Sequence, residues 1–457
     1  MNYGIWTLFP VFVVIVLALK TKRSLEPLVI STLIAYIIID GSNFLTSWCD
    51  AFFEIATNSS NQWVFMVCCL FGSLIALLGA SHGALGFSEK LEKFCRGPKS
   101  TMLITWIIGI LIFVDDYLNI MTLSTCMKKM TDRRKVPRES LSYIIDSTGA
   151  PVCALLPFST WAVFFATLFY EQPGIKELGF GSPMETFYQI IPFIFYAIFA
   201  VFIVPMFIFG IVPKLGKMKI AYKRVQNGGK VYSKESEQLN LEEEFGVDDN
   251  VKLKGNMWDF ILPVGTLIIY AIATSDLFKA VILSIFVCFI LYIPRKKLNL
   301  NVFCDLIMHG FCGMIPTVAI IFFAFVMQKA MSDIGMATYV IDVIRPYMNG
   351  AIFPASVFLT VALLNFSTGS VWGIPAIVSS IIIPLGFSIG ANPVFVMGAI
   401  VSGATLGSHA CFYSDATVLT SSCCKMENMD HAMSQFPYAM LAAIFSVIGY
   451  LYCGFFM

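Results

Sequence analysis

The chain of 457 residues is 58% hydrophobic and only 13% charged, and its net charge at pH 7 is +1. A soluble domain carries roughly 25% charged residues, so this composition is that of a membrane protein. A net charge near zero gives no reason to expect a nucleic-acid partner. The 13 cysteines include no CxxC pair, so we expect buried thiols rather than a zinc site or a disulfide framework.

Apolar runs of about 20 residues, the length that crosses a hydrocarbon core of about 30 Å, recur along the chain. They lie near residues 3–19, 26–46, 62–80, 187–213, 258–275, 278–294, 305–330 and 435–456. Basic clusters, which gather on the cytoplasmic side of membranes, lie at 20–23, 128–138, 214–224 and 294–297. The sequence therefore predicts a multi-pass protein of the cell membrane with both termini outside. It also predicts an external loop over 40–61 and a cytoplasmic amphipathic helix within 82–100.

The segment 101–127 would violate the charge distribution if it crossed the membrane, because the basic run 128–138 would then lie outside. We therefore predict that it enters and turns back, with its turn in VDDYLN at 114–119. Irregular backbone at membrane depth must be buried in protein or line a water-filled cavity. The two adjacent acids of this turn, Asp115 and Asp116, are thus expected at the tip of a re-entrant hairpin.

The next segment, 139–170, is long enough to cross the membrane but carries a glycine and two prolines in its middle. Proline removes a backbone donor and clashes with the preceding helical turn. We therefore predict a crossing helix that is broken near the midplane. Three polar residues, Asp146, Ser147 and Thr148, come directly before the break.

The second half repeats this order of elements. Its spans are followed by a hairpin over 353–390, a segment broken at 403–417 and a final span. The two halves start on opposite sides of the membrane, so the sequence predicts inverted repeats, an architecture of many secondary transporters. The first repeat would cover 1–213, a cytoplasmic linker 214–256, and the second repeat 257–457. The predicted fold class is an all-α polytopic membrane protein in which each repeat has spanning helices, a re-entrant hairpin and a broken helix.

Inverted repeats bring the hairpin turns and the helix breaks together near the membrane midplane. Carbonyl, hydroxyl, amide and carboxylate oxygens suit a hard cation such as Na⁺, and adjacent acids repel, so one of them is expected to take up a proton. The candidate residues for binding a substrate or proton are Asp115, Asp116, Asn119, Asp146, Ser147, Thr148, Asn365, Ser367, Thr368, Ser370, Trp372, His409, Ser414 and Asp415. The candidate ligands of Na⁺ are Asp116, Asn119, Thr148, Ser414 and Asp415.

Two stretches resemble the NhaC family of sodium/proton antiporters, namely FVDDYLNIMTLSTCMKKMTDRRKVPRESLSYIIDSTGAPVCALLPFSTW (113–161) and GSHACFYSDATVLTSSCCKMENMDHAMSQFPYA (407–439). The resemblance covers most of the chain. It implies a sodium-coupled transporter of the ion-transporter superfamily, with an elevator-like alternating-access movement and, commonly, a homodimer. Ser408 stands where the family usually has Asp, and Phe412 and Ala416 replace a Pro and a Thr. Because one acid of the second motif is missing, a Na⁺- or H⁺-coupled carrier of an amino acid or carboxylate is the alternative.

Each candidate residue also has a structural alternative. Asp115 and Asp116 could cap a half-helix. Asp146 could pair with Arg138 or another cytoplasmic base as a structural bridge, and His409 could be a core histidine hydrogen-bonded to a carbonyl. The other three histidines, His82, His309 and His431, lie near predicted helix ends and are expected to be structural.

Paired aspartates in a membrane also occur in a different class of protein, the intramembrane aspartyl proteases. Such a protease would need one acid from each of two facing helices, but the sequence has no GxGD motif. Inverted repeats would also serve no purpose in a protease. We therefore predict a transporter rather than an enzyme, with the lipid bilayer, Na⁺ and H⁺ or a small organic solute as its partners, and with no cofactor.

Overall fold

The computed structural model describes residues 3–21, 25–81, 83, 95–113, 115–157, 159–240, 256–274, 276–344, 346, 349–369 and 371–457. These residues form helices joined by turns, and there is no strand among them. Six helical segments within the described ranges are long and apolar enough to cross a membrane, or seven if a bent pair is counted. The predicted fold class, an all-α polytopic membrane protein, is confirmed.

Helices of the first half are α1 (Phe9–Thr21), α2 (Leu25–Asp40), α3 (Phe44–Thr57), α4 (Ser59–Ala80), α6 (Pro98–Leu111), α7 (Asp116–Arg133), α8 (Arg138–Thr148), α9 (Ala150–Leu155), α10 (Thr160–Tyr170), α11 (Pro183–Ile190) and α12 (Phe195–Phe209). Helices of the second half are α13 (Gly216–Gln226), α15 (Trp258–Thr274), α16 (Leu277–Tyr292), α17 (Leu300–Gly313), α18 (Ile315–Asp333), α19 (Met336–Ile344), α20 (Phe353–Thr368), α21 (Gly373–Ser388), α22 (Pro393–Ala410), α23 (Asp415–Cys423) and α24 (Asn428–Phe456).

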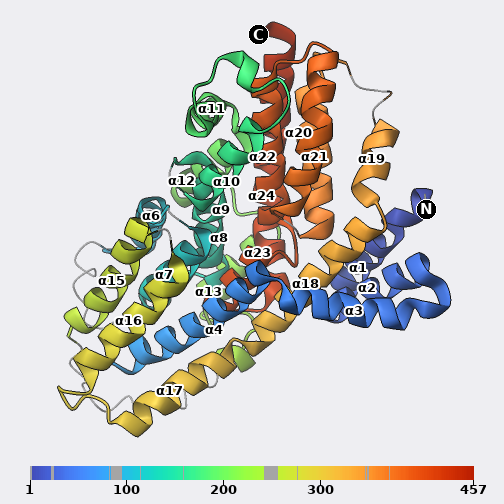
Figure 1. Ribbon diagram of the computed structural model, residues 1–457. Helices are drawn as coiled ribbons and strands as arrows, with labels where there is room; N and C mark the ends of the chain where they lie inside the picture. The colour runs from blue at the N-terminus through green and yellow to red at the C-terminus, as the bar shows by residue number, and fades with distance from the viewer. Residues whose placement is uncertain are drawn as a thin grey trace.

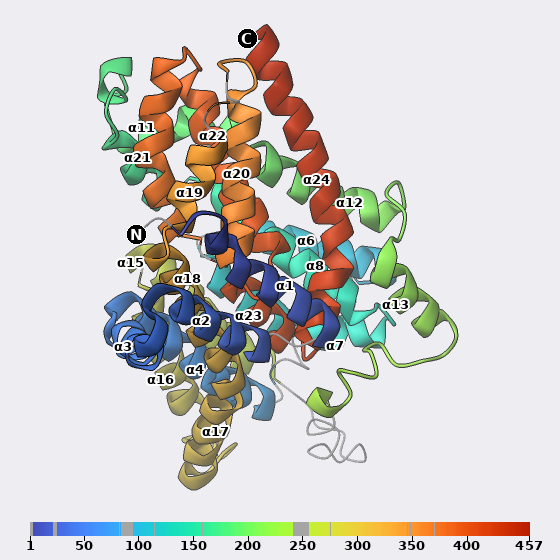
Figure 2. The same ribbon diagram turned by 90° about the vertical axis from the view of Figure 1, so that its right-hand side faces the viewer.

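The helices form two groups with separate hydrophobic cores. Figure 1 shows α20, α21, α22 and α24 side by side in one group, while α4, α15, α16 and α17 extend away as a second group. The view turned by 90° shows the same separation, with α2 and α3 beside α18 and α1 beside α2 (Figure 2). Helix α7 lies between the groups, because it contacts α8 and α23 on one side and α4 and α15 on the other.

The helix–turn–helix predicted over 101–127 is present as α6 and α7, but the turn comes earlier than the predicted 114–119, because Asp115 caps α7 and residues 116–119 already belong to that helix. The predicted breaks are also present. Helix α8 ends at Thr148 and is followed by the short helix α9, while α22 ends at Ala410 and α23 begins at Asp415. Helix ends gather around this turn and these breaks. The helices that begin or end there are α6, α7, α8, α9, α20, α22 and α23.

Three predictions need correction or lie outside the described residues. The loop expected over 40–61 is wrong, because helix α3 occupies most of it and buries Ala51 and Ile55 against the rest of the protein. The run 187–213 is not one straight span, since its two helical parts meet at 54°. Most of the amphipathic helix expected within 82–100 lies outside the described residues.

Helices α4 and α17 approach each other through two glycines. A Cβ atom on Gly72 would meet the carbonyl oxygen of Gly310, and a Cβ atom on Gly310 would meet that of Gly72. The neighbouring Ser73 hydroxyl donates to the carbonyl of Ile307 at 2.8 Å. Small residues let helix backbones come this close inside a membrane, where packing takes over from the hydrophobic effect.

We expect Gly72→Ala and Gly310→Ala each to lower the free energy of unfolding by about 1–3 kcal/mol, because the added methyl group collides with backbone. Gly79→Ala on α4 and Gly313→Ala on α17 are the matched controls, since nothing lies within 4 Å of a Cβ atom at either position. Thermal unfolding of the purified protein in detergent measures the difference. Equal effects of all four substitutions would show that the close approach of α4 and α17 does not contribute to stability.

Candidate functional site

Three carboxylates, which we call the acid group, lie where helices α7 and α23 begin. Asp115, Asp116 and Asp415 are 6%, 5% and 8% exposed. The hydroxyl of Tyr117 donates to the carboxylate of Asp415 and so joins α7 to α23. None of the ion pairs found in the described part of the chain includes one of these three acids. The acid group is therefore a cluster of buried carboxyl groups without a basic partner in the described part of the chain.

Hydrogen bonds fix Asp115 and Asp415 in place. Asp115 is the N-cap of α7, because its Oδ1 accepts from the amide of Leu118 at 3.1 Å. Its Oδ2 accepts from the Thr160 hydroxyl at 3.3 Å, which connects the hairpin to α10. Asp415 accepts from the next amide in α23 at 2.8 Å. The capping alternative is thus correct for Asp115, although capping uses only one of its two oxygens.

Asp146, at the end of α8, is completely buried and bound from α24. Its Oδ2 lies 3.2 Å from His431 Nε2 and accepts from Gln435 Nε2 at 2.6 Å. The other nitrogen of His431 lies 2.9 Å from the hydroxyl of Ser142. Arg138 pairs with Asp132 at 2.8 Å, so the base that contacts Asp146 is not Arg138 but His431, in the segment predicted to be cytoplasmic.

His409 connects four helices at the end of α22. Its Nε2 lies 3.1 Å from the Ser147 hydroxyl of α8, and its Nδ1 lies 2.7 Å from the Tyr196 hydroxyl of α12. Its carbonyl oxygen accepts from Gln435 Nε2 of α24 at 2.5 Å. We call Asp146, His409, His431 and Gln435 the histidine network. Because its members come from both halves of the chain, the network holds the two broken helices together.

Asn119 holds the hairpin turn against the broken helix. Its Nδ2 donates to the carbonyls of Gly109, Ile112 and Thr148 at 2.6, 2.9 and 3.1 Å. The Thr148 hydroxyl donates within its own helix, to the carbonyl of Ile144 at 2.9 Å. These two predicted Na⁺ ligands are therefore close together, with the nitrogen of Asn119 fully used for structure.

The predicted residues of α20 and α21 lie beside the same breaks. Asn365 Nδ2 donates to the carbonyl of Ala404 in α22 at 3.3 Å. Ser367 and Thr368 donate to carbonyls of their own helix at 2.6 and 2.9 Å. Trp372 packs against Trp161 with ring centroids 5.5 Å apart. Ser370, the remaining predicted residue of this turn, lies outside the described residues.

The five predicted Na⁺ ligands do not converge as one set of free oxygens. Ser414 is the N-cap of α23, and its hydroxyl donates to the carbonyl of Ser408 at 2.7 Å. In the described ranges, no group of three or more His, Cys, Asp or Glu side chains is arranged to hold a metal ion. Ligands for a hard cation would therefore have to include amide, hydroxyl or carbonyl oxygens.

Several buried oxygens of this region have no hydrogen-bond partner among the described residues. They are Asn119 Oδ1, Asp146 Oδ1, Asn365 Oδ1, Ser408 Oγ and Gln435 Oε1. A buried acceptor left without a partner costs about 1–3 kcal/mol, so oxygens of this kind mark places that water or an ion would occupy.

Helix ends around the site favour positive charge. Helices α6, α8, α20 and α22 end here, and the C-terminal end of a helix attracts cations. The N-terminal ends of α7 and α23, which would attract anions, are already occupied by Asp115 and Asp415. The region as a whole therefore suits a cation or proton better than an anion.

Four residues that contribute to the site were missed in the sequence. Tyr117 directly follows the acid pair, and its position there was a usable signal. His431 and Gln435 are four residues apart, so they share one face of α24. This spacing was a usable signal, but His431 was expected to be only structural. Tyr196 lies in an apolar run that offers no signal for it.

Comparison with known proteins finds a family match, two related proteins and one solved structure. Residues 163–455 match the Na⁺/H⁺ antiporter family. An uncharacterized protein of Haemophilus influenzae is 28% identical over 501 aligned positions, which cover 99% of this chain and 91% of that protein. The malate-2H(+)/Na(+)-lactate antiporter of Bacillus subtilis is 29% identical over 113 positions, 24% of each protein. The solved structure of Neisseria gonorrhoeae MtrF, described as illuminating a class of antimetabolite efflux pumps, aligns over 90% of this chain and 83% of that one, with 16% identity and a TM-score of 0.39.

Substitution of Asp115 separates its capping role from its charge. Asp115→Ala removes the cap of α7 and is expected to lower the free energy of unfolding by about 1 kcal/mol. Asp115→Asn keeps an equally good N-cap and is expected to unfold like the wild type. Thermal unfolding in detergent measures both. An equal loss in the two variants would mean that the charge of Asp115, and not its hydrogen bond to Leu118, holds the turn.

Proposed function

Since the chain belongs to the Na⁺/H⁺ antiporter family, we propose that this sodium-coupled membrane transporter exchanges Na⁺ for H⁺ across the cell membrane. One observation carries the proposal: the three carboxylates of the acid group are buried together and have no basic partner in the described part of the chain. A charge at the centre of a bilayer costs roughly 2.5–3.5 kcal/mol even on lenient scales. A bound Na⁺ or a proton offsets that cost.

Competition for the same oxygens explains the exchange. Adjacent carboxylates repel one another, so the acid group cannot hold all its negative charge unless a cation is bound. Na⁺ entering the group displaces protons, and protons arriving at lower pH displace Na⁺. Tyr117 holds Asp415 toward α7, and Thr160 holds Asp115 toward α10, so the acids remain together when their occupant changes. The proposed transporter uses Na⁺ as its coupling ion and no cofactor.

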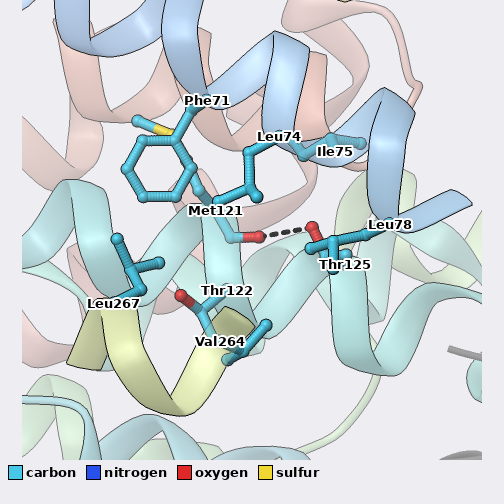
Figure 3. A pocket seen from close by; sticks show the side chains of 9 residues that line it. All are labelled: Phe71, Leu74, Ile75, Leu78, Met121, Thr122, Thr125, Val264 and Leu267. Atoms are coloured by element: carbon cyan, nitrogen blue, oxygen red, sulfur yellow. Dashed lines mark hydrogen bonds between the residues drawn. The ribbon is translucent and has the colours of Figure 1, made fainter. Parts of the chain in front are cut away.

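An elevator-like movement is supported by the surface between the two helix groups. Figure 3 shows Met121 and Thr122 of α7 facing Phe71 and Leu74 of α4 and Val264 of α15. The hydrogen bond drawn there, from Thr125 to the carbonyl of Met121, stays within α7. Because the contact across this surface is largely apolar, α7 and the elements bound to it can slide along α4 and α15 without breaking a polar network. We propose that α4 and α15 belong to the fixed scaffold.

The inverted-repeat organisation, with repeats over 1–213 and 257–457, is part of this proposal. The order of elements supports it, because the helix pair α6–α7 is followed by the break between α8 and α9, as the pair α20–α21 is followed by the break between α22 and α23. Outward-facing termini and a homodimer complete the proposed arrangement.

A second candidate function is coupled transport of a small organic acid or amino acid. It is favoured by the partial match to the Bacillus subtilis antiporter, whose name gives malate and lactate as its cargo. An aromatic wall also lies beside the acid group, where Phe164 and Trp161 pack on Trp372 at 4.8 and 5.5 Å. Such a wall would suit the apolar part of an organic solute.

Proteoliposomes test the proposal directly. We expect a Na⁺ gradient to drive proton movement through the wild type, and Asp415→Asn to reduce that rate by about tenfold or more, the effect of losing roughly 1.4 kcal/mol of ion binding. Asp305→Asn, on the exposed surface of α17, is the matched control and is expected to match the wild type. Unchanged Na⁺ dependence in Asp415→Asn would make Asp415 structural. Na⁺-driven uptake of a solute without proton movement would establish the second candidate instead.

A further inference from the structure

We infer that a second site for a monovalent cation, Na⁺, lies beside the acid group and is formed by Asp146 Oδ1, Gln435 Oε1 and Ser408 Oγ. The three residues come from α8, α24 and α22, which all belong to segments long enough to span the membrane. The inference rests on the proposed function, because it adds an ion-binding site to the same transporter.

The direction of the Gln435 amide is fixed by its partners. Its Nε2 donates to Asp146 Oδ2 at 2.6 Å and to the carbonyl of His409 at 2.5 Å. Both partners are oxygens that accept hydrogen bonds, so the nitrogen of the amide must face them and its oxygen must face elsewhere. Gln435 Oε1 is thereby left pointing into the protein interior without a donor in the described chain.

The carboxylate of Asp146 is fixed in the same way. Both His431 and Gln435 approach its Oδ2, at 3.2 and 2.6 Å, which leaves Oδ1 with no donor among the described residues. Ser408 directly precedes His409, whose carbonyl binds Gln435, so its hydroxyl lies at the same end of α22. The exposed fractions of Asp146, Gln435 and Ser408 are 0%, 0% and 1%. Three fully buried oxygens without donors among the described residues thus lie on helices that the Gln435 amide joins.

The donor set selects the class of ion. Carboxylate, amide and hydroxyl oxygens are ligands for hard cations rather than for metals that prefer sulfur or imidazole. One carboxylate balances one positive charge, whereas Ca²⁺ sites in proteins draw on several carboxylates. Helix α22 ends at this point, and its C-terminal end adds further attraction for a cation.

Occupancy of this site would be transmitted to the acid group through the break between α22 and α23. The carbonyl of Ser408 accepts from the hydroxyl of Ser414 at 2.7 Å, and Ser414 is the N-cap that begins α23. The next residue, Asp415, belongs to the acid group. A cation held by Ser408 therefore fixes the segment that positions Asp415, which gives a structural reason for cooperation between the two sites.

Sodium binding to the purified protein tests the inference. We expect NaCl, compared with choline chloride, to raise the unfolding temperature of the wild type, because a ligand that binds the folded state stabilises it. Gln435→Leu is expected to raise the half-saturating Na⁺ concentration, in this assay and in transport, by about tenfold or more, and Ser408→Ala by a few-fold. Ser446→Ala is the matched control on α24, because this buried hydroxyl bonds to its own helix at 2.7 Å.

Two outcomes contradict different claims. If Ser408→Ala and Gln435→Leu bind Na⁺ as the control does, the three oxygens hold water and this inference is overturned, while Na⁺-driven transport by the wild type still supports the proposed function. If the wild type shows no Na⁺ dependence at all, the proposed function itself is wrong. Should Gln435→Leu fail to fold, Ser408→Ala decides alone, because loss of an unpaired buried hydroxyl is not expected to destabilise the protein in choline chloride.

Discussion

Buried negative charge without a fixed counterion is the constraint on which the rest of this structure depends. Carboxylates within a membrane protein need a compensating charge, and the described part of the chain supplies no lysine or arginine to the acid group. The helix breaks answer part of this need, because they place Asp115 and Asp415 at the N-terminal ends of α7 and α23, while the C-terminal ends of α6, α8, α20 and α22 attract a cation. The helix breaks, the N-caps and the buried amide side chains therefore surround the acid group together. A mobile cation or proton completes the charge balance.

Residues of the predicted cytoplasmic linker hold helices α8 and α24 in place relative to each other. The described part of that linker, 214–240, includes helix α13 and binds the starts of both α8 and α24. Arg224 forms two bonds of 2.9 Å with Glu139 of α8, and Asp430 of α24 is bound by Lys217 at 2.6 Å and by Ser233 at 2.5 Å. Because Asp430 adjoins His431, these contacts help to set the position of His431 against Asp146. The segment expected as a simple linker is thus a structural part of the core.

The turns and helix breaks could be predicted from local sequence signals, whereas contacts between residues far apart in the chain could not. The hairpin at Asp115 follows from charge distribution, and the break near 149 follows from glycine and proline, which act on neighbouring residues. The break predicted within 403–417 lies after Ala410, whereas its two glycines, Gly403 and Gly407, lie inside α22. The contact of Asp146 with His431 joins residues 285 positions apart, and the sequence carries no rule that pairs them. The loop expected over 40–61 was wrong because its position between two spans was weighed and the apolar residues of α3 were not.

The central claim, that Na⁺ and protons compete for the acid group, is tested most directly by counting protons released when Na⁺ binds. Isothermal titration calorimetry of the purified protein in buffers of different ionisation enthalpy gives that count. The account predicts a heat of Na⁺ binding that varies with the buffer, an apparent Na⁺ affinity that weakens as pH falls, and a flatter pH dependence in Asp115→Asn or Asp116→Asn. Sodium binding with the same heat in every buffer would contradict it.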